Sequence, residues 1–401
     1  MKILQLTKKF PYPLKDGESI AITYLAQALH DLGAEVTLLS MNTSKHYFDI
    51  ATLPTDFDHY AARHLVEVDN RVKIGDALLN LFSSDSYHIA RFISSDFEAK
   101  LADLLQQNSY DIIQLETLYL APYVPIIRQY STAKIVMRSH NVEYEIWKRI
   151  TENTNLGAKK AYLSLLTKRL RDFELKSLNT YDLLVAITQR DLDFFAQKNC
   201  AIPTHVTPIG LELAQYISTP YSASPAVTFC FIGSLDWMPN IEGVEWVLAN
   251  VWDQVLAQVP TATFHVAGRN CPEQLLQQQH QNVVIHGEVE DALTFINAYD
   301  VMLVPLFSGS GMRVKILEGM ALQKTVISTS LGLEGIAAAH QQEVLIADQA
   351  KDFVSEMVAL AANEKQLEYI GKNAREFIQK EFDNRAIAAE LLQQYEALLL
   401  Q

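Results

Sequence analysis

Cysteine and long apolar runs are both scarce in this sequence. The three cysteines, Cys200, Cys230 and Cys271, are far apart, without the paired spacing of a zinc site or the even count of a disulfide framework. The apolar runs, such as residues 301–307, are much too short to cross a bilayer. The first residues predict a strand rather than a signal peptide. We therefore expect a soluble protein of the reducing cytoplasm, which is compatible with a position at the inner face of the membrane.

Positive charge is scarce as well. The net charge is −14, and it is uneven: residues 1–206 hold 23 Lys and Arg against 24 Asp and Glu, whereas the rest of the chain holds 10 against 23. Nucleic-acid binding requires a basic surface that displaces counterions from phosphates. The sequence therefore predicts no nucleic-acid partner.

One span is an exception to this shortage of positive charge. Residues 148–176 contain eight Lys and Arg and three Asp and Glu. Their apolar members Tyr162, Leu166, Leu170 and Phe173 recur at helical spacing, and we expect them to face a core. The cations then form a solvated face or, alternatively, a surface for an anionic acceptor or for peripheral contact with a membrane.

Metal-ligand patterns are missing too. The 11 histidines lack the paired spacing of a metal site. Asp191 and Asp193 form an Asp-x-Asp pair, but they follow Thr188 at an expected helix start, where acidic residues favour the helix dipole. We predict no metal ion and no cofactor.

Strands alternate with helices along the chain. Residues 3–6 predict a strand, 20–32 a helix and 35–40 the next strand, which together make a βαβ unit. Further strands are expected at 111–115, 134–137, 183–187, 227–232, 263–267, 283–286, 301–304 and 325–328, with a helix at 241–258. At this length two domains are expected. The alternation predicts an α/β fold with two doubly wound domains.

A proline-containing stretch separates the two halves. Residues 201–226 include four prolines and no long periodic segment, which predicts a linker. We place the N-terminal domain at 1–206 and the C-terminal domain at 207–384. The last helix, 385–401, is expected to pack back on the N-terminal domain.

The most informative segment follows the strand expected at 301–304. It reads Ser308-Gly309-Ser310-Gly311-Met312-Arg313-Val314-Lys315-Ile316-Leu317-Glu318. Glycines let backbone N–H groups turn toward an anion, and the start of a helix adds partial positive charge. Arg313 and Lys315 add two cations suited to a diphosphate, and Glu318 adds a carboxylate for ribose hydroxyls. The alternative is a capped helix with both cations solvated, although cations oppose the dipole at that end.

In this segment the sequence resembles retaining glycosyltransferase family four, also called glycosyl transferases group one. The resemblance extends over essentially the whole chain and includes residues 205–210, 231–234, 309–321 and 325–329. It implies a GT-B fold, in which two Rossmann-like domains face each other across a cleft. It also implies hexosyl transfer from a nucleoside diphosphate with retention of configuration, without a metal or a covalent enzyme carboxylate, typical of polysaccharide biosynthesis.

The resemblance assigns the nucleotide sugar to the C-terminal domain and the acceptor, a glycan, a lipid-linked sugar or a small molecule, to the N-terminal domain. Arg313 and Lys315 are expected to stabilise the departing diphosphate. The expected donor-binding residues are Gly233, Gly287, Ser308, Gly309, Ser310, Gly311 and Glu318.

Two places depart from the family pattern. The family often has a Glu that touches the donor sugar where this chain has Ser310. Many members also have an Arg and a Lys in the loop that matches residues 233–240, which contain neither. Similar sequences with a Gly-Ser-Gly-x-Arg-x-Lys motif form a branch in which Arg313 and Lys315 supply the missing charge.

The acceptor-side candidates lie in the N-terminal domain. The resemblance places His140 near the transferred sugar or the acceptor, as a catalytic residue, with Glu143 close by. The alternative is a turn in which Asn141 caps a helix and Glu143 lies in its first turn. Asp16 and Gly17 lie in the first strand-to-helix loop, where the family approaches the donor or acceptor, and an exposed turn is the alternative.

The sequence has three alternative functional interpretations. A nucleotide-sugar epimerase of the same fold would need general-base carboxylates in the cleft. A catalytically inactive nucleotide-binding protein would be consistent with Ser310. A dehydrogenase is disfavoured, because neither domain's first strand is followed by a glycine fingerprint with a downstream acid.

Overall fold

The computed structural model divides into two compact units. It describes residues 1–14, 16–73, 75, 80, 85–154, 157–219, 226–309 and 311–401. Unit 1 comprises Met1–Gly210 and Asn384–Gln401, and unit 2 comprises Leu211–Asp383. The sequence placed the first boundary four residues earlier, after 206.

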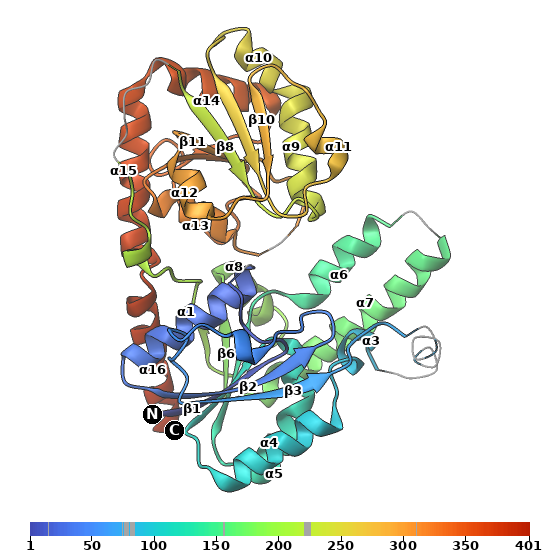
Figure 1. Ribbon diagram of the computed structural model, residues 1–401. Helices are drawn as coiled ribbons and strands as arrows, with labels where there is room; N and C mark the ends of the chain where they lie inside the picture. Colours follow the sequence, from blue (N-terminus) through green and yellow to red (C-terminus); the bar gives the residue numbers. More distant parts are fainter. Residues whose placement is uncertain are drawn as a thin grey trace. The chain divides into compact units, whose positions relative to one another are not determined.

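Unit 1 is built on a parallel sheet flanked by helices (Figure 1). In the described part of the chain this sheet has seven strands in the order β3-β2-β1-β4-β5-β6-β7. The strands are β1 Lys2–Thr7, β2 Glu35–Thr43, β3 Ala62–Val68, β4 Ile112–Glu116, β5 Lys134–Ser139, β6 Leu183–Ala186 and β7 Thr204–Val206. The helices are α1 Gly17–Asp31, α3 Tyr87–Ala90, α4 Ser95–Gln107, α5 Val124–Tyr130, α6 Glu143–Glu152, α7 Gly157–Ser177, α8 Gln189–Ala196 and α16 Asn384–Leu399.

The two faces of this sheet pack into separate cores. Side chains alternate along a strand, so Leu4 and Leu6 of β1 join one apolar cluster, whereas Ile3 joins the other. The second cluster also contains Leu391 and Tyr395 of α16, which lies beside α1 in Figure 1. Helices therefore cover both faces, as a doubly wound sheet requires.

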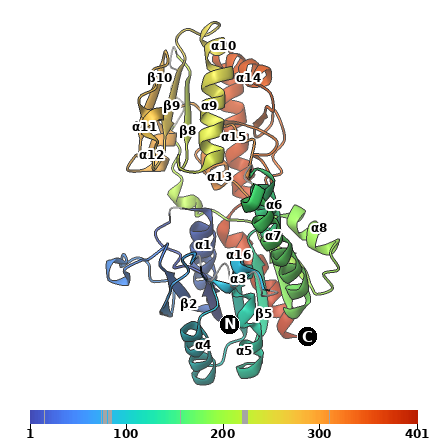
Figure 2. The ribbon, with the colours of Figure 1, turned by 90° about the vertical axis from the view of Figure 1, so that its right-hand side faces the viewer.

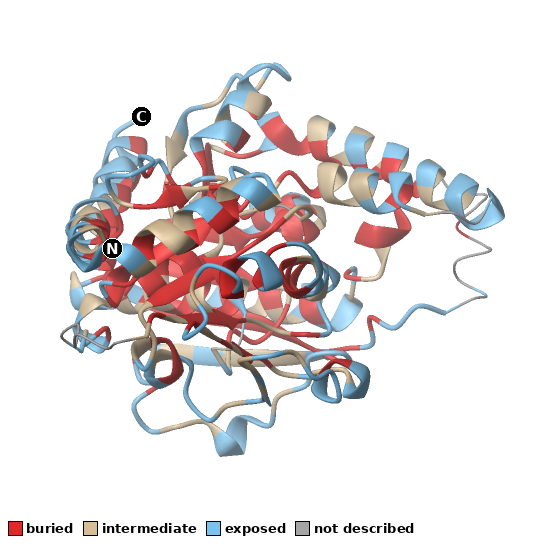
Figure 3. Ribbon diagram, turned by 90° about the horizontal axis from the view of Figure 1, so that it is seen from above, coloured by how far each residue is buried: buried red, intermediate tan, exposed pale blue. Residues whose placement is uncertain are grey.

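Unit 2 repeats the architecture with a smaller sheet. Within the described ranges it has six strands in the order β10-β9-β8-β11-β12-β13, all parallel (Figure 2). The strands are β8 Thr228–Ile232, β9 Thr263–Ala267, β10 Val283–Gly287, β11 Val301–Val304, β12 Thr325–Ser328 and β13 Leu345–Ile346. The helices are α9 Met238–Asn250, α10 Trp252–Leu256, α11 Glu273–Leu276, α12 Ala292–Asn297, α13 Val314–Ala321, α14 Ala350–Ala362 and α15 Glu364–Glu381. Strands β8, β11 and β12 are almost wholly buried, whereas β10 is half-exposed. Figure 3 shows buried residues toward the inside of the fold and exposed residues on the outer faces of the helices.

Three details correct the sequence-based assignment. The expected linker, 201–226, contains β7, which pairs with β6, because a short strand can extend the sheet without a periodic pattern of its own. The edge strands β3 and β13 were not expected, since β3 is only half-buried and β13 has two residues. The helix expected at 241–258 is interrupted at Val251.

The burial of α16 predicts that this helix stabilises unit 1. Leu391 is fully buried there, whereas Leu399 on the same helix is 41% exposed. We expect Leu391→Ala to lower the free energy of unfolding by about 2–5 kcal/mol, because it leaves a cavity in the core. Leu399→Ala should change it by less than about 0.5 kcal/mol. Urea unfolding of both variants measures the difference, and equal effects would contradict the packing of α16 on unit 1.

Candidate functional site

The expected phosphate-binding segment joins β11 to α13. Gly309 (φ 99°) and Gly311 (φ 83°) have left-handed backbone, which favours glycine. A Cβ at Gly309 would lie 3.2 Å from the guanidinium of Arg313. Arg313 occupies the N-cap position of α13, and its guanidinium donates to the carbonyl of Gly311. Arg313 therefore folds back over its own glycine turn. Ser310 lies outside the described residues.

Lys315 extends from α13 to the end of β8. Its Nζ donates to the carbonyl of Ile232 at 3.1 Å and to Oδ1 of Asn240 at 2.8 Å. The same atom lies 4.3 Å from the centroid of the Phe231 ring, a cation–π arrangement. A Cβ at Gly233 would lie 2.7 Å from Nζ, so glycine leaves room for the ammonium. The structure thus brings Lys315 and Gly233 together, and Lys315 delivers positive charge to a loop that has none.

Burial shifts the pKa values of two side chains of α13, Lys315 and Glu318, so that the uncharged form of each is favoured. Burial, reinforced by Arg313, lowers the pKa of Lys315 to about 7. Burial raises the pKa of Glu318 to about 7, although Tyr216 and Lys315 act in the opposite direction. The Tyr216 hydroxyl lies 3.5 Å from Oε1 of Glu318. A ligand that brings negative charge to Lys315, or hydrogen-bond donors to Glu318, would favour the charged form of each.

The other expected donor residues are less closely grouped. The Ser308 hydroxyl donates to Glu242 of α9 at 2.8 Å. Gly287 has left-handed backbone at the end of β10, and β9 separates that strand from β8. Sequence reasoning missed Asn240 of α9, the partner of Lys315. The sequence feature that could have identified Asn240 is its position just after the loop that follows β8.

Asp16 and Gly17 begin α1 in unit 1. Asp16 Oδ1 accepts from the Ser19 N–H at 2.9 Å, and Lys9 Nζ donates to Asp16 at 2.7 Å. Burial alone would raise the pKa of Asp16, but Lys9 and Ser19 lower it more strongly. Gly17 is the first residue of the helix. Asp16 is thus a helix-capping residue, and contact of either residue with a substrate stays a prediction.

His140 lies just beyond β5 and meets a buried carboxylate. Its Nε2 is 2.7 Å from Oε2 of Glu116, the last residue of β4, which is fully buried. Gln5 donates to the other carboxylate oxygen at 2.7 Å, and Arg138 donates to Oε2 at 3.3 Å. Burial would raise the pKa of Glu116, yet Arg138, His140 and Gln5 lower it to about 2. The ionised carboxylate accepts a hydrogen bond from Nε2 and so fixes the orientation of the imidazole, which leaves Nδ1 on the other side of the ring.

Sequence reasoning missed Glu116 and a second pair beside it. Glu116 is the last residue of β4, which pairs with β5, the strand that precedes His140. The sequence feature that could have identified it is a carboxylate at the carboxyl end of an expected strand. The second pair is Lys8 and Glu18, 3.0 Å apart. Lys8 Nζ also lies 4.5 Å from the centroid of the Tyr119 ring. Both pairs lie at the carboxyl edge of the sheet, where open α/β sheets bind ligands.

Glu143 is the first residue of α6 and is buried. The Tyr119 hydroxyl donates to its Oε2 at 3.0 Å, and burial raises the pKa of Glu143. The alternative interpretation was right to place Glu143 in the first turn of this helix but wrong about the cap, because Val142 and not Asn141 occupies the N-cap position, without a side-chain cap bond. The carboxylate of Glu174 on α7 instead accepts from the first two N–H groups of α6, at 2.9 and 3.0 Å. Tertiary packing supplies this cap.

Asp191 lies in the first turn of α8, as expected, whereas Asp193 lies in the middle of this helix. The Thr188 hydroxyl accepts from the Asp191 N–H at 3.1 Å, and Arg190 pairs with Asp191 at 2.9 Å. Within the described ranges, no group of three or more His, Cys, Asp and Glu is placed to hold a metal ion.

The basic span 148–176 includes the second half of α6 and nearly all of α7. Of the four apolar residues expected to face the core, Leu166 and Leu170 are buried, whereas Tyr162 and Phe173 are only half-buried. No helix in the described part of the chain is long and apolar enough to cross a membrane. Peripheral contact through this span stays a prediction, which equal binding to neutral and anionic vesicles would contradict.

Comparison with known proteins relates the sequence and the fold to glycosyltransferases. Residues 226–363 match the family described as glycosyl transferases group 1. The chain is 22% identical to an "uncharacterized 44.6 kDa protein in cps region" of Klebsiella pneumoniae, over 98% of this chain and 99% of that one.

Solved structures share the architecture over the whole length. A sucrose-phosphate synthase from Thermosynechococcus elongatus superposes with a TM-score of 0.72 at 17% identity, covering 100% of both chains. Anabaena HepE, in complex with UDP and glucose, superposes with a TM-score of 0.67 at 15% identity, covering 99% of both. The chain therefore has the GT-B fold with two Rossmann-like domains. The family match over residues 226–363 supports a glycosyltransferase.

Proposed function

We propose that the protein is a retaining glycosyltransferase that moves a hexose-like sugar from a nucleoside diphosphate to a glycan, a lipid-linked sugar or a small molecule. The observation that carries the proposal is the position of Lys315 Nζ beside Gly233, at the carboxyl end of β8. HepE, in complex with UDP and glucose, supports UDP-glucose as the first donor to test. The relative named for a cps region supports a polysaccharide acceptor.

In the proposed donor site, α13 supplies the charges. Arg313 and Lys315 bind the diphosphate and stabilise the charge that develops on it as the sugar departs. Backbone N–H groups of Gly309 and Gly311 contribute dipoles that favour an anion. Glu318 accepts hydrogen bonds from the ribose hydroxyls, which are charge-assisted once the carboxylate is ionised.

In the proposed acceptor site, unit 1 supplies an oriented imidazole. His140 contacts the transferred sugar or the acceptor through Nδ1, while Glu116 holds Nε2 and is a positioning residue. Asp16, Gly17 and Glu143 line the acceptor side. The sugar leaves and the acceptor attacks on the same face, so catalysis rests on placement and on leaving-group stabilisation.

The first test separates the roles of three side chains of α13. We expect Arg313→Ala and Lys315→Ala to lower kcat about a hundredfold or more, with a much smaller change in UDP-glucose binding, since their contacts strengthen as charge develops. Glu318→Gln should mainly weaken binding of both UDP-glucose and UDP. Steady-state kinetics and calorimetric binding measure the two effects.

The matched control is Lys372→Ala, because the Lys372 side chain is 70% exposed on the surface of unit 2. It should leave both quantities unchanged. Wild-type kinetics for both the Arg313 and the Lys315 variants, in folded protein, would refute the proposed site of the leaving group.

The second test is the pH dependence of donor binding. Lys315, with a pKa of about 7, attracts the diphosphate only when protonated, so affinity should fall above pH 7 by the same small factor that Lys315→Ala produces. Glu318, with a pKa of about 7, accepts ribose hydroxyls best when ionised, so affinity should also fall below 7. Binding of UDP-glucose, whose diphosphate stays ionised throughout, measured between about pH 5.5 and about 8.5, should peak near neutrality.

Two variants show which side chain causes the fall in affinity on each side of the pH optimum. Lys315→Met should abolish the decline on the alkaline side, and Glu318→Gln the decline on the acidic side. A wild-type affinity that stays constant over the range would contradict the role of both groups.

The third test concerns the metal and the stereochemistry. We expect sugar transfer to persist in excess chelator, and the product to keep the anomeric configuration of the donor. Anomer-resolved NMR of the product, with and without chelator, measures both. An inverted product would refute retention, and a complete loss of transfer that added metal restores would refute metal independence.

A further inference from the structure

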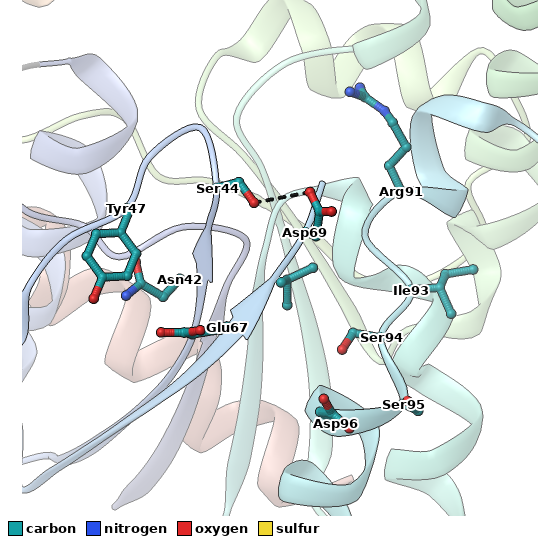
Figure 4. A pocket seen from close by; sticks show the side chains of 11 residues that line it. Asn42, Ser44, Tyr47, Glu67, Asp69, Arg91, Ile93, Ser94, Ser95 and Asp96 are labelled. Carbon is teal, nitrogen blue, oxygen red and sulfur yellow. Dashed lines mark hydrogen bonds between the residues drawn. The ribbon is translucent and has the colours of Figure 1, made fainter. Parts of the chain in front are cut away.

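A polar hollow lies in unit 1 where β2 and β3 end. It has a volume of about 590 Å³ and is bounded by the ends of these strands, the loop after β2 and the start of α4 (Figure 4). Small-molecule sites typically have volumes of roughly 300–1,000 Å³. Open parallel sheets bind their ligands outside the carboxyl ends of the strands. Both the size and the place of the hollow are therefore those of a ligand site.

One wall of the hollow presents an aromatic ring. The amide of buried Asn42 binds the backbone of Phe48 twice, donating to its carbonyl and accepting from its N–H, each at 2.9 Å. This fastens the loop between them, and Tyr47 at its tip is 63% exposed. A large aromatic side chain at the surface makes an amphipathic contact face at low entropic cost. In Figure 4, Tyr47 and Asn42 lie on the side opposite Ser94 and Asp96.

Internal bonds hold the rest of the wall in place. The Ser44 hydroxyl donates to Asp69 at 3.2 Å, which joins the ends of β2 and β3. Ser94 caps α4. Arg91 donates to the carbonyl of Asn70 at 3.3 Å. The rim is thus built by the fold around the hollow.

Several polar groups of the wall are left for a ligand. Among the described residues, the carboxylates of Glu67 and Asp96 and the hydroxyl of Ser95 have no hydrogen-bond partner. Asp69, by contrast, is held by Arg71 at 2.8 Å and Lys73 at 3.1 Å. The two open carboxylates carry negative charge, so they accept from hydroxyl groups and repel phosphates and uronates, while the Ser95 hydroxyl both donates and accepts.

We propose that this hollow binds a neutral sugar unit of a glycan acceptor. Tyr47 stacks on the apolar face of a pyranose ring, while Glu67, Asp96 and Ser95 bind its hydroxyl groups. The inference rests on the proposed function and deepens it, because it names the acceptor class as an oligosaccharide with neutral sugars. The acidic wall also distinguishes this hollow chemically from the proposed donor site, where cations bind a diphosphate.

Saturation-transfer NMR on the full chain tests the proposal, with neutral trisaccharides of glucose, galactose, mannose and N-acetylglucosamine as probes. At least one should bind. Its affinity should fall about tenfold in Tyr47→Ala and in Asp96→Asn. The matched controls are Tyr130→Ala, a tyrosine of α5 that is 38% exposed, and Glu98→Gln, an exposed acid in the first turn of α4. Both should bind like the wild type.

UDP-glucose binding by the same samples separates this inference from the proposed function. The Tyr47 and Asp96 variants should keep it. If UDP-glucose binds and no neutral trisaccharide does, the inference is wrong and the proposed donor site stands. If a trisaccharide binds through Tyr47 and UDP-glucose does not bind, the donor site is wrong and the sugar-binding hollow stands. Equal losses in the controls, or Tyr47-dependent binding of a glucuronate oligosaccharide, would overturn the assignment to a neutral sugar.

Discussion

A charge at the edge of a parallel sheet is stable only where it has partners, and this constraint shapes both units. Fully buried Glu116 is surrounded by Gln5, Arg138 and His140, and without them its burial would be very unfavourable. Lys315 is compensated less completely. Its partners among the described residues are a backbone carbonyl, an amide oxygen and an aromatic face. An anion is the group that would complete its surroundings, which is the physical basis for placing a diphosphate there.

Much of the fold follows from local patterns in the sequence. Central strands such as β1 and β4 are apolar on both faces, because helices cover them on both sides, and such runs are visible without a structure. The edge strand β3 is mostly half-buried and has no regular alternation of buried and exposed residues. β7 gains its stability from pairing with β6 rather than from its three residues. Such edges depend on a neighbour that the local pattern does not reveal.

At the candidate site, too, some features follow from the local sequence and others depend on tertiary packing. The glycine turn, Arg313 and Lys315 are contiguous in the sequence, so their chemistry could be predicted. The contact of Lys315 with Asn240 joins residues 75 positions apart, and no spacing rule connects them. The cap of α6 shows the same limit, because Glu174 reaches that helix from α7. Local rules predicted the residue types at the site, and tertiary packing decided which of them meet.

The charge distribution would make nearby cations decisive for binding the proposed anionic donor. Residues 207–401 carry 10 Lys and Arg against 23 Asp and Glu, so the overall field of this half repels a diphosphate. Exposed charges separated by more than about 8–10 Å are largely screened at physiological ionic strength. A cation in a half-buried contact is screened far less. Arg313 and Lys315 therefore outweigh the distant acids where a diphosphate would sit. The surrounding acidity disfavours anions that bring no sugar or nucleoside contacts of their own, so donor selection would depend on the whole nucleotide sugar rather than on its phosphates alone.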